Sequence, residues 1–272
     1  MSFQKILNKD CFEGMKEFKD KSINLVLTSP FYNTSSKATK TNTLSQTGIK
    51  KGSYPAIRYD EFVDNMTDEE YYDFTLRLFA EFDRLIVPNG VVLYNVSYGV
   101  ENPSGMFINI SNICQKSNWT IADVITWKKP SAMPNNVSNN RLTRIVEYVF
   151  VLCRKSEDKT FYMNKKILYK NESGQNIYDN IYNYVEARNN DGCNSLNKAT
   201  YSTELCKKLL HLYADTKNEN FTVYDPFMGT GTTAAACKEM NLNCLGTEIS
   251  KAQVEYATRR LANTGTVIDL FS

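Results

Sequence analysis

A serine, a proline and two aromatic residues follow a short apolar run near the N-terminus. The run covers residues 23–27, and the segment after it reads Thr28-Ser29-Pro30-Phe31-Tyr32. The Ser29 hydroxyl and the Pro30 carbonyl can accept hydrogen bonds, and proline stiffens a turn without adding an N–H donor. Tyr32 offers a ring face on which a planar group can stack. These residue types could bind an amine at the end of a strand, although an ordinary strand-to-loop turn with an incidental Ser-Pro pair fits them too.

A glycine-rich turn lies in the C-terminal part of the chain. Its sequence is Asp225-Pro226-Phe227-Met228-Gly229-Thr230-Gly231, after a strand-like run and before a helical stretch that begins at Thr232. Glycine lets the backbone approach a ligand without a Cβ clash. The turn is not the G-x-G-x-x-G of dinucleotide enzymes, and it lacks the lysine of a P-loop. A lone G-x-G is explained equally well by a tight turn that binds nothing.

Glu248 makes the glycine turn more specific. It ends the next strand-like run, about twenty residues past the turn, where nucleotide-binding α/β folds place an acid that accepts both hydroxyls of a ribose. Glu248 alone would be explained as a residue near a helix N-cap. The order of strand, glycine turn, helix, strand and acid indicates a nucleotide-like ligand.

The glycine turn and Glu248 resemble the cofactor site of S-adenosylmethionine-dependent methyltransferases. In that family a D-P-F-x-G-x-G turn wraps the methionine part of the cofactor, and the acid after the following strand holds the ribose. The resemblance implies S-adenosyl-L-methionine as cofactor and a Rossmann-like α/β methyltransferase fold. The residues to which it assigns cofactor contacts are Asp225, Phe227, Met228, Gly229, Gly231, Thr232 and Glu248.

The first segment resembles the (Ser/Asn/Asp)-Pro-Pro-(Tyr/Phe) motif of DNA methyltransferases that modify exocyclic amino groups. There the first side chain and the proline carbonyl accept the two amino hydrogens, which localises the nitrogen lone pair for attack on the sulfonium methyl. The resemblance implies base flipping and assigns catalysis to Ser29, Pro30, Phe31 and Tyr32, with Tyr32 stacked on the flipped base. Phe31 stands where the family usually has a second proline, so the turn loses rigidity.

The catalytic segment precedes the glycine turn, which is the motif order of the β class of these enzymes. In this class an acid after the first strand contacts the adenine part of the cofactor, which implies Asp10 and the adjacent Cys11. Residues 197–202 resemble the segment that closes over the methionine moiety, so Thr200 joins Ser29 in contacting the cofactor.

Residues 127–130 and 141–150 resemble the segments that surround the flipped base in the same class. Basic side chains in and beside these segments form one of two basic groups in the chain. Both groups could pair with DNA phosphates, although each lysine alone is well explained as a solvated surface residue. The other group lies in residues 34–59, which contain no acid, and it predicts a mobile DNA-contacting loop at residues 33–60. That loop carries Lys37, Lys40, Lys50, Lys51 and Arg58. The group beside the base segments is Lys128, Lys129, Arg141, Arg144, Arg154 and Lys155.

These segments need a scaffold, and the pattern along the chain predicts one α/β domain over residues 1–272. Short β-rich runs alternate with amphipathic stretches, which is typical of a mostly parallel sheet with helices on both faces, and we expect seven strands. Residues 156–197, rich in Asn, Tyr and Lys, form the expected target-recognition insertion. Strands are expected at residues 5–7, 23–27, 91–96, 122–127, 146–152, 221–224 and 244–247, and helices at 68–85, 203–213, 232–240 and 251–261.

The composition argues against several other chemistries. None of the seven cysteines forms a C-x-x-C pair and His211 is the single histidine, so neither a metal site nor a disulfide framework is expected. His211 is expected at a surface or half-buried helix position, which argues against a His-based hydrolase. No Pro-Cys pair occurs, which disfavours methylation of cytosine C5 through a thiol nucleophile. Without a signal-like start or a long apolar run, a cytoplasmic protein of a bacterium or phage is expected.

The resemblance leaves the target open. Serine in the first catalytic position favours N4 of cytosine, and N6 of adenine is the alternative because both need the same hydrogen-bond geometry. Methylation of RNA or of a protein glutamine, and an inactive nucleic-acid-binding module, are further alternatives that the long basic loop and the intact motifs disfavour. Double-stranded DNA is the expected partner. A cognate restriction endonuclease is the second expected partner, and the protein itself is expected to be a monomer or a homodimer.

Overall fold

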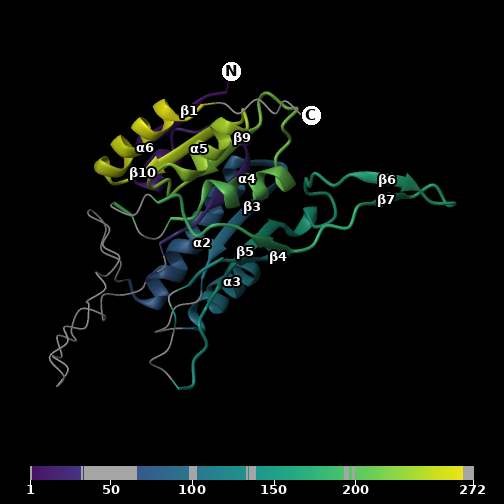
Figure 1. Cartoon of the computed structure of the whole chain (residues 1–272), viewed down its shortest axis with the longest axis horizontal. Coiled ribbons are helices and arrows are strands. Elements are labelled where there is room, and N and C mark those ends of the chain that lie inside the picture. The colour runs from purple at the N-terminus through teal and green to yellow at the C-terminus, as the bar shows by residue number, and fades with distance from the viewer. Residues whose placement is uncertain are drawn as a thin grey trace.

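The chain folds around one eight-stranded sheet, whose strands come from both halves of the sequence (Figure 1). The computed structural model describes residues 2–31, 33, 66–97, 103–132, 134, 139–192, 196–197 and 200–265. The strands stand in the order β1-β10-β9-β2-β3-β5-β4-β8, and among them only β5 runs against its neighbours. Their bounds are β1 (Gln4–Asn8), β2 (Ile23–Thr28), β3 (Ile86–Val96), β4 (Trp119–Lys128), β5 (Val146–Arg154), β8 (Tyr184–Glu186), β9 (Thr222–Asp225) and β10 (Asn243–Glu248).

The expected mostly parallel sheet is confirmed, but it has eight strands and not seven. All the expected strands are present, with β3 beginning earlier than its apolar run suggests. The additional strand, β8, pairs in parallel with the end of β4. It is three residues long and buries only Val185, so its alternation is too short for a sequence pattern to reveal.

Six α-helices pack on the sheet in the part of the chain that the structure describes, and none of them is long and apolar enough to cross a bilayer. Helix α2 has its expected bounds because Thr67 and Glu70 form a reciprocal capping box. His211 is exposed in the last turn of α4, as expected. Helix α3 was missed by the sequence pattern because exposed Phe107 and Ile108 blur its apolar stripe. The helices are α1 (Cys11–Met15), α2 (Asp68–Leu85), α3 (Gly105–Lys116), α4 (Thr203–Tyr213), α5 (Thr232–Glu239) and α6 (Lys251–Asn263).

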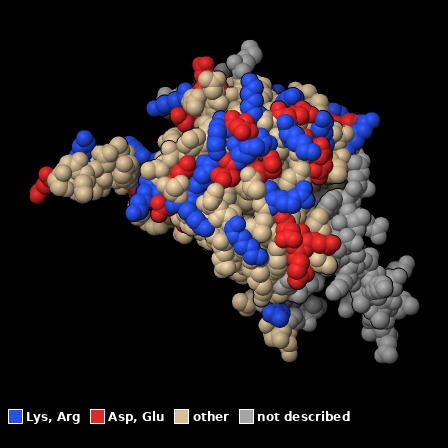
Figure 2. Space-filling model, turned by 180° about the vertical axis from the view of Figure 1, so that it is seen from behind, with Lys and Arg blue, Asp and Glu red and all other residues tan. Residues whose placement is uncertain are grey.

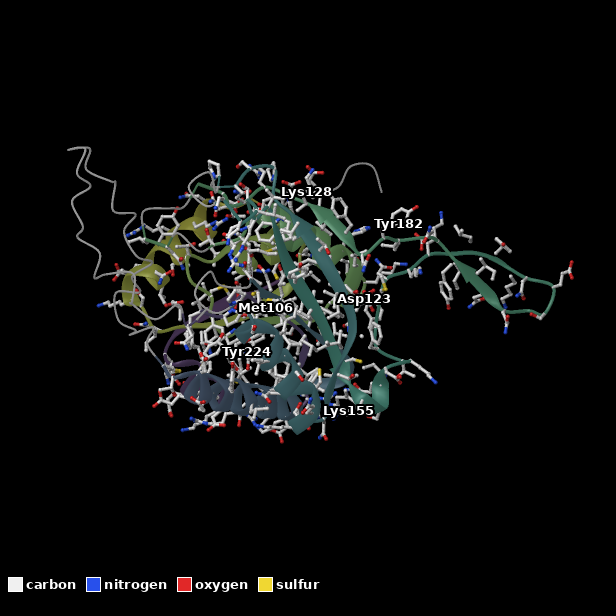
Figure 3. All side chains as sticks on the ribbon, turned by 90° about the horizontal axis from the view of Figure 1, so that it is seen from below. Met106, Asp123, Lys128, Lys155, Tyr182 and Tyr224 are labelled. Carbon is white, nitrogen blue, oxygen red and sulfur yellow. The ribbon has the colours of Figure 1, made fainter. Side chains whose placement is uncertain are left out.

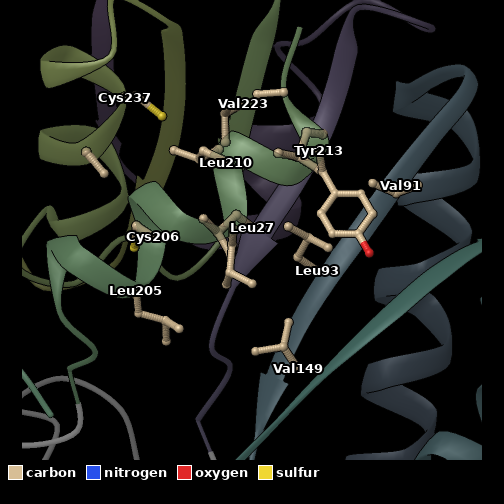
Figure 4. Packing of buried hydrophobic residues seen from close by; sticks show 14 of the residues in the cluster. Leu27, Val91, Leu93, Val149, Leu205, Cys206, Leu210, Tyr213, Val223 and Cys237 are labelled. Carbon is tan, nitrogen blue, oxygen red and sulfur yellow. The ribbon is translucent and has the colours of Figure 1, made fainter. Parts of the chain in front are cut away.

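Apolar side chains fill both faces of the sheet. On one face, α1, α2 and α3 pack over the strands, with Phe79 and Val26 in the same buried cluster. On the other face, α4 and α5 cover the strands, and Figure 4 shows Leu205 of α4 on the same side as Leu27 of β2. Residues 25–27 are all apolar because neighbouring side chains in a strand enter opposite cores, as is usual when a parallel sheet is covered on both faces.

The parallel strands end at one edge of the sheet. In open α/β sheets this carboxyl edge is where ligands bind. Lys9, Ser29, Pro226 and Ile249 are the first residues after β1, β2, β9 and β10. The segments that the sequence singled out for chemistry therefore meet at the same edge, although they are far apart along the chain.

Residues 156–197 contain a two-stranded ribbon that projects from the body of the protein (Figures 1 and 3). Strands β6 (Ile167–Lys170) and β7 (Asn176–Tyr178) pair with each other, and no other described strand joins them. The short helix η2 (Lys155–Glu157) precedes the ribbon, and β8 follows it. Several large apolar or aromatic side chains on and beside the ribbon are exposed, namely Ile167, Leu168, Tyr169, Tyr178 and Tyr182.

Candidate active site

A pocket of about 970 Å³, counted up to its open mouth, lies at the carboxyl edge of the sheet. Gly231 is not among its lining residues, and Tyr32 lies outside the described residues. The expected cofactor and catalytic residues that do line it are Asp10, Cys11, Ser29, Pro30, Phe31, Thr200, Asp225, Phe227, Met228, Gly229, Thr232 and Glu248.

The Asp225 carboxylate is turned into the protein and joins the two motifs. Its Oδ1 accepts hydrogen bonds from Thr28 Oγ1 at 2.7 Å and from the Phe227 N–H at 3.0 Å. Its Oδ2 accepts from Thr233 Oγ1 at 2.6 Å and from Tyr201 Oη at 3.2 Å. Burial raises the pKa of Asp225 above its usual range, and these hydrogen bonds oppose the shift. Asp225 therefore connects the end of β2 to the glycine turn.

Two glycines of the turn have left-handed backbones and serve different neighbours. The φ angles are 53° at Gly229 and 81° at Gly231. Gly229 lines the pocket, whereas a Cβ at Gly231 would lie 2.8 Å from the Cβ of Ala257 in α6. One glycine therefore keeps the ligand side of the turn open, and the other allows α6 to pack closely behind it.

Glu248 ends β10 with its carboxylate oriented by the backbone. The Gly229 N–H donates to Oε2 over 2.8 Å, and the Ser250 N–H donates to Oε1 over 2.9 Å. A carboxylate oxygen has two lone pairs and can accept more than one hydrogen bond, so hydroxyl groups of a ligand in the pocket can also donate to Glu248. The arrangement fits a ribose whose two hydroxyls donate to one carboxylate.

Asp10 and Cys11 line the pocket after the end of β1. Asp10 is the N-cap of α1, and its Oδ1 accepts a hydrogen bond from the Phe12 N–H at 2.9 Å. Burial, assisted by the charge of Asp10, raises the pKa of the Cys11 thiol to about 12. Cys11 is therefore a neutral part of the wall and not a thiolate.

Three phenylalanine rings form one wall of the pocket. The centroid of the Phe31 ring lies 5.1 Å from that of Phe74 and 5.9 Å from that of Phe227. Phe31 and Phe227 belong to the two motifs, whereas Phe74 comes from α2 and no motif pointed to it. An aromatic residue on the inner side of an amphipathic helix is the only signal in the sequence, and core residues give the same signal.

A polar cluster lies at the ends of β3, β4 and β5, beside the catalytic segment. Lys129 and Glu147 form an ion pair, and Lys129 Nζ lies 4.9 Å from the ring centroid of Trp127. Asn95 Nδ2 donates to a β5 carbonyl at 3.2 Å, and its Oδ1 has no partner among the residues that the structure describes. The last paired residues of β2 and β3 are Thr28 and Tyr94, which immediately precede Ser29 and Asn95 in the chain. The two segments expected around a flipped base thus meet here.

The basic residues expected to contact DNA are only partly within the described chain. Lys128, at the end of β4, pairs with Glu186 over 3.0 Å. Arg141 is exposed and Arg144 is half-buried, and both precede the start of β5 at the carboxyl edge. The loop residues Lys37, Lys40, Lys50, Lys51 and Arg58 lie outside the described residues.

Arg154 and Lys155 do not belong to this group, so that part of the prediction is wrong. Arg154 is the last residue of β5, which runs away from the carboxyl edge, and Lys155 follows it. Figure 3 shows Lys128 and Lys155 at opposite ends of the sheet. The Arg154 guanidinium is buried against Asp83 at 2.6 Å and Glu157 at 3.2 Å. On the face shown in Figure 2, Lys and Arg are interspersed with Asp and Glu, so that face has no single-sign surface for a polyanion.

Comparisons with known proteins agree with this geometry. Residues 23–259 match the model of the DNA methylase family of N6- and N4-methyltransferases. The type II methyltransferase M.MjaI of Methanocaldococcus jannaschii is 25% identical over 266 residues, which cover 88% of this chain and 84% of that protein. The type II methyltransferase M.HinfI of Haemophilus influenzae is 25% identical over 269 residues, which cover 94% of this chain and 67% of that protein.

Solved structures share the fold. The cytosine-N4-specific PvuII DNA methyltransferase superposes with a TM-score of 0.68 at 16% identity, over 100% of this chain and 89% of that one. M1.HpyAVI in its complex with SAM superposes with a TM-score of 0.58 at 20% identity, over 95% of this chain and 100% of that one. At these identities the likeness concerns the fold alone.

Proposed function

The chain belongs to the DNA methylase family, and we propose that it methylates N4 of cytosine in double-stranded DNA. It is an S-adenosylmethionine-dependent DNA amino-methyltransferase. One observation above others supports the proposal: Ser29 and Pro30, which follow β2, line the same pocket as the glycine turn, which follows β9. An acceptor pair suited to an amine therefore adjoins a site suited to the methyl donor.

S-adenosylmethionine supplies an electrophilic methyl group on a positively charged sulfur. Glu248 would accept its ribose hydroxyls, and Gly229 would leave room for its methionine part. Thr200 Oγ1 is buried and has no hydrogen-bond partner within the described part of the chain, so a polar group of the cofactor would satisfy it. Phe74 and Phe227 offer an apolar wall for the remaining parts of the cofactor. The residues present therefore fit this cofactor.

An exocyclic amine of a base is a poor nucleophile because its lone pair is delocalised into the ring. Ser29 Oγ and the Pro30 carbonyl would accept the two amino hydrogens, which draws the nitrogen toward tetrahedral geometry and localises the lone pair. Tyr32 would stack on the extruded base and hold it in the pocket. In the transfer the nitrogen would bond to the methyl carbon as the carbon–sulfur bond breaks, with the bonding electrons going to sulfur to leave the neutral thioether. The methylated nitrogen would then release one proton to solvent, because Ser29 Oγ and the Pro30 carbonyl accept hydrogen bonds but are not bases that retain a proton.

Direct transfer of this kind needs no cysteine. Burial raises the pKa of Cys11 to about 12, and it raises those of Cys206 and Cys237 well above the usual range, so these thiols stay protonated. We therefore expect no covalent enzyme–DNA adduct on DNA that contains 5-fluorocytosine. A cross-linked band on a denaturing gel would contradict direct transfer.

Serine at position 29 supports cytosine as the target. In the related motif, serine is associated with N4 of cytosine and aspartate with N6 of adenine. Methylation of adenine N6 is the alternative, because the hydrogen-bond geometry at the amino group is the same for both bases.

DNA would bind across the carboxyl edge. Lys128, Lys129, Arg141 and Arg144 are the proposed phosphate contacts there, together with the basic side chains of residues 33–60. Residues 156–197 would read the bases, since a two-stranded ribbon such as β6–β7 fits the major groove. The relatives described above are type II methyltransferases, so we place this chain in a restriction–modification system with a cognate endonuclease.

One experiment separates these activities. The protein is incubated with S-adenosylmethionine that carries a labelled methyl group, in parallel with duplex DNA, RNA or a protein mixture, and the digested products are analysed by mass spectrometry. N4-methylcytosine in DNA is the expected product. N6-methyladenine would establish the alternative, whereas 5-methylcytosine, or label found only in RNA or protein, would overturn the proposal.

A further inference from the structure

Phe31 takes the place of the second proline of the related motif, yet contacts from other elements restrain it. It is 8% exposed. Its ring centroid lies 5.4 Å from that of Tyr71 and 5.1 Å from that of Phe74, both in α2, and 5.9 Å from that of Phe227 in the glycine turn. The Phe31 ring therefore bridges helix α2 and the glycine turn.

Helix α2 and Met66, two residues before it, also hold the backbone of the catalytic segment. Tyr71 Oη donates to the Phe31 carbonyl oxygen over 2.7 Å. Asn33 Nδ2 donates to the Met66 carbonyl oxygen over 2.9 Å, just before α2 begins. Asn33 has a left-handed backbone with φ 48°, a conformation that asparagine tolerates better than most residues. The segment is thus attached at two points to the start of α2.

We propose that Tyr71 is a positioning residue whose hydroxyl fixes the Ser29-Pro30-Phe31 turn in the orientation needed for methyl transfer. A proline at position 31 would lock its own φ at about −65°. Phe31 lacks that lock, but its carbonyl is anchored by Tyr71 and its ring is packed on three sides, so contacts restrict the same rotation. The inference rests on the proposed function, which places Ser29 and Pro30 at the reacting amine.

Helix α2 does not need this hydrogen bond for its own stability. Its first turn is closed by the capping box of Thr67 and Glu70. Leu78, Phe79 and Phe82 anchor its later turns in the buried cluster. Removal of the Tyr71 hydroxyl should therefore leave the helix in place and act on the turn.

The test compares Tyr71→Phe with Tyr72→Phe, which removes a hydroxyl from the neighbouring residue of the same helix. With saturating DNA and S-adenosylmethionine, kcat of Tyr71→Phe should fall about threefold to tenfold, as expected for the loss of one hydrogen bond. Its donor affinity by calorimetry should match that of Tyr72→Phe, whose kcat should equal that of the unchanged protein. Its unfolding should remain a single cooperative transition, with the midpoint lowered only as far as the loss of one hydrogen bond requires. A Tyr71→Phe variant with full kcat, or an equal loss in both variants, would overturn the positioning role.

A second comparison uses Phe31→Pro, which restores the ring constraint within the turn. In that background Tyr71→Phe should lower kcat less than about twofold, because proline already fixes φ. An equal reduction in both backgrounds would show that the hydroxyl acts in another way. If Phe31→Pro does not fold, the comparison with Tyr72→Phe decides.

Ser29→Ala separates the positioning role of Tyr71 from the proposed function itself. Full activity of Ser29→Ala would refute the catalytic assignment itself, whereas impaired Ser29→Ala with unimpaired Tyr71→Phe would refute only the positioning role.

Discussion

The Thr28 hydroxyl donates a 2.7 Å hydrogen bond to the carboxylate of Asp225, which lies 197 positions later in the chain. Thr28 ends β2 and Asp225 ends β9, and these two strands are neighbours in the sheet. One buried bond thus joins the strand that leads to the catalytic segment with the strand that leads to the glycine turn. The relative placement of Ser29 and Pro30, the proposed acceptors, and of the glycine turn, the proposed donor site, depends on this pair of strand ends.

Thr28→Val removes this donor with little change in shape and should lower the free energy of unfolding by about 1–3 kcal/mol. Burial already raises the pKa of Asp225, and the lost bond opposed that shift, so the pKa should rise further in the variant. A raised pKa means that the folded state binds a proton more readily than the unfolded chain, so stability falls as the pH rises through the folded-state pKa. Urea unfolding should therefore show a larger loss at about pH 8 than at about pH 5. Thr120→Val in β4 is the control, and a pH-independent loss in Thr28→Val would show that the bond does not act on an ionised Asp225.

Glu248→Ala should weaken binding of S-adenosylmethionine by about tenfold to a hundredfold, because the ribose hydroxyls lose their acceptor and the Gly229 N–H loses its partner. The fold should survive, since Glu248 ends a strand and belongs to neither apolar cluster. Titration calorimetry measures the affinity. Glu255→Ala on the exposed side of α6 is the matched control, and unchanged affinity in a folded Glu248→Ala would remove this residue from the site.

Gly231→Ala should destabilise the protein more than Gly174→Ala. Both glycines have left-handed backbones, with φ 81° and 78°, so each substitution carries a similar strain of about 1–2 kcal/mol. A Cβ at Gly174 meets nothing within 4 Å, whereas one at Gly231 would lie 2.8 Å from the Ala257 Cβ. Addition of Ala257→Gly should recover only part of the loss, because the new Cβ would still lie 3.2 Å from the Ala257 Cα and because glycine inside α6 costs about 1 kcal/mol. Equal unfolding midpoints for the two single variants would mean that α6 does not pack against the turn as described.

Replacing Arg141 and Arg144 together by alanine should weaken DNA binding and flatten its salt dependence, by about one unit of slope for each lost phosphate contact. Both residues precede β5 at the carboxyl edge. Lys217→Ala is the control, because this exposed lysine follows α4 near the other edge of the sheet. Fluorescence anisotropy across a salt series gives the slopes. If the double variant keeps its slope, the phosphate contacts lie elsewhere.

The placement of the site was predictable because the direction of the strands, and not their order in the sheet, decides which motifs meet at one edge. Parallel strands all end at one edge, so motifs that follow different strands come together in any parallel arrangement. For this reason Asp10, Ser29, Asp225 and Glu248 could be assigned to one pocket from sequence. The start of α2 could equally be predicted from the sequence, because the Thr67 capping box is a local signal.

Contacts between elements could not be predicted from the sequence in the same way. The pattern of α2 does not distinguish Phe74, which lines the pocket, from Phe79, which lies in the core. A strand of nine residues, such as β5, separates its two ends by roughly 30 Å, so Arg144 and Arg154 reach opposite edges although they are close in sequence. The bond from Tyr71 to Phe31 depends on the angle at which α2 packs, and no spacing along the chain encodes that angle.

The β6–β7 ribbon stands outside both apolar clusters, so substitutions in the ribbon and substitutions in the core differ in what they cost the stability of the domain. Substitutions in the buried clusters reduce a stability margin that is on the order of only 5–15 kcal/mol for a whole domain. Residues Ile167–Lys170 are all exposed, so changes there leave that margin nearly intact. Mutations can therefore accumulate in the ribbon without loss of the pocket. If the ribbon reads the bases as proposed, substitutions there can change which DNA is recognised while the domain that carries the pocket keeps its stability.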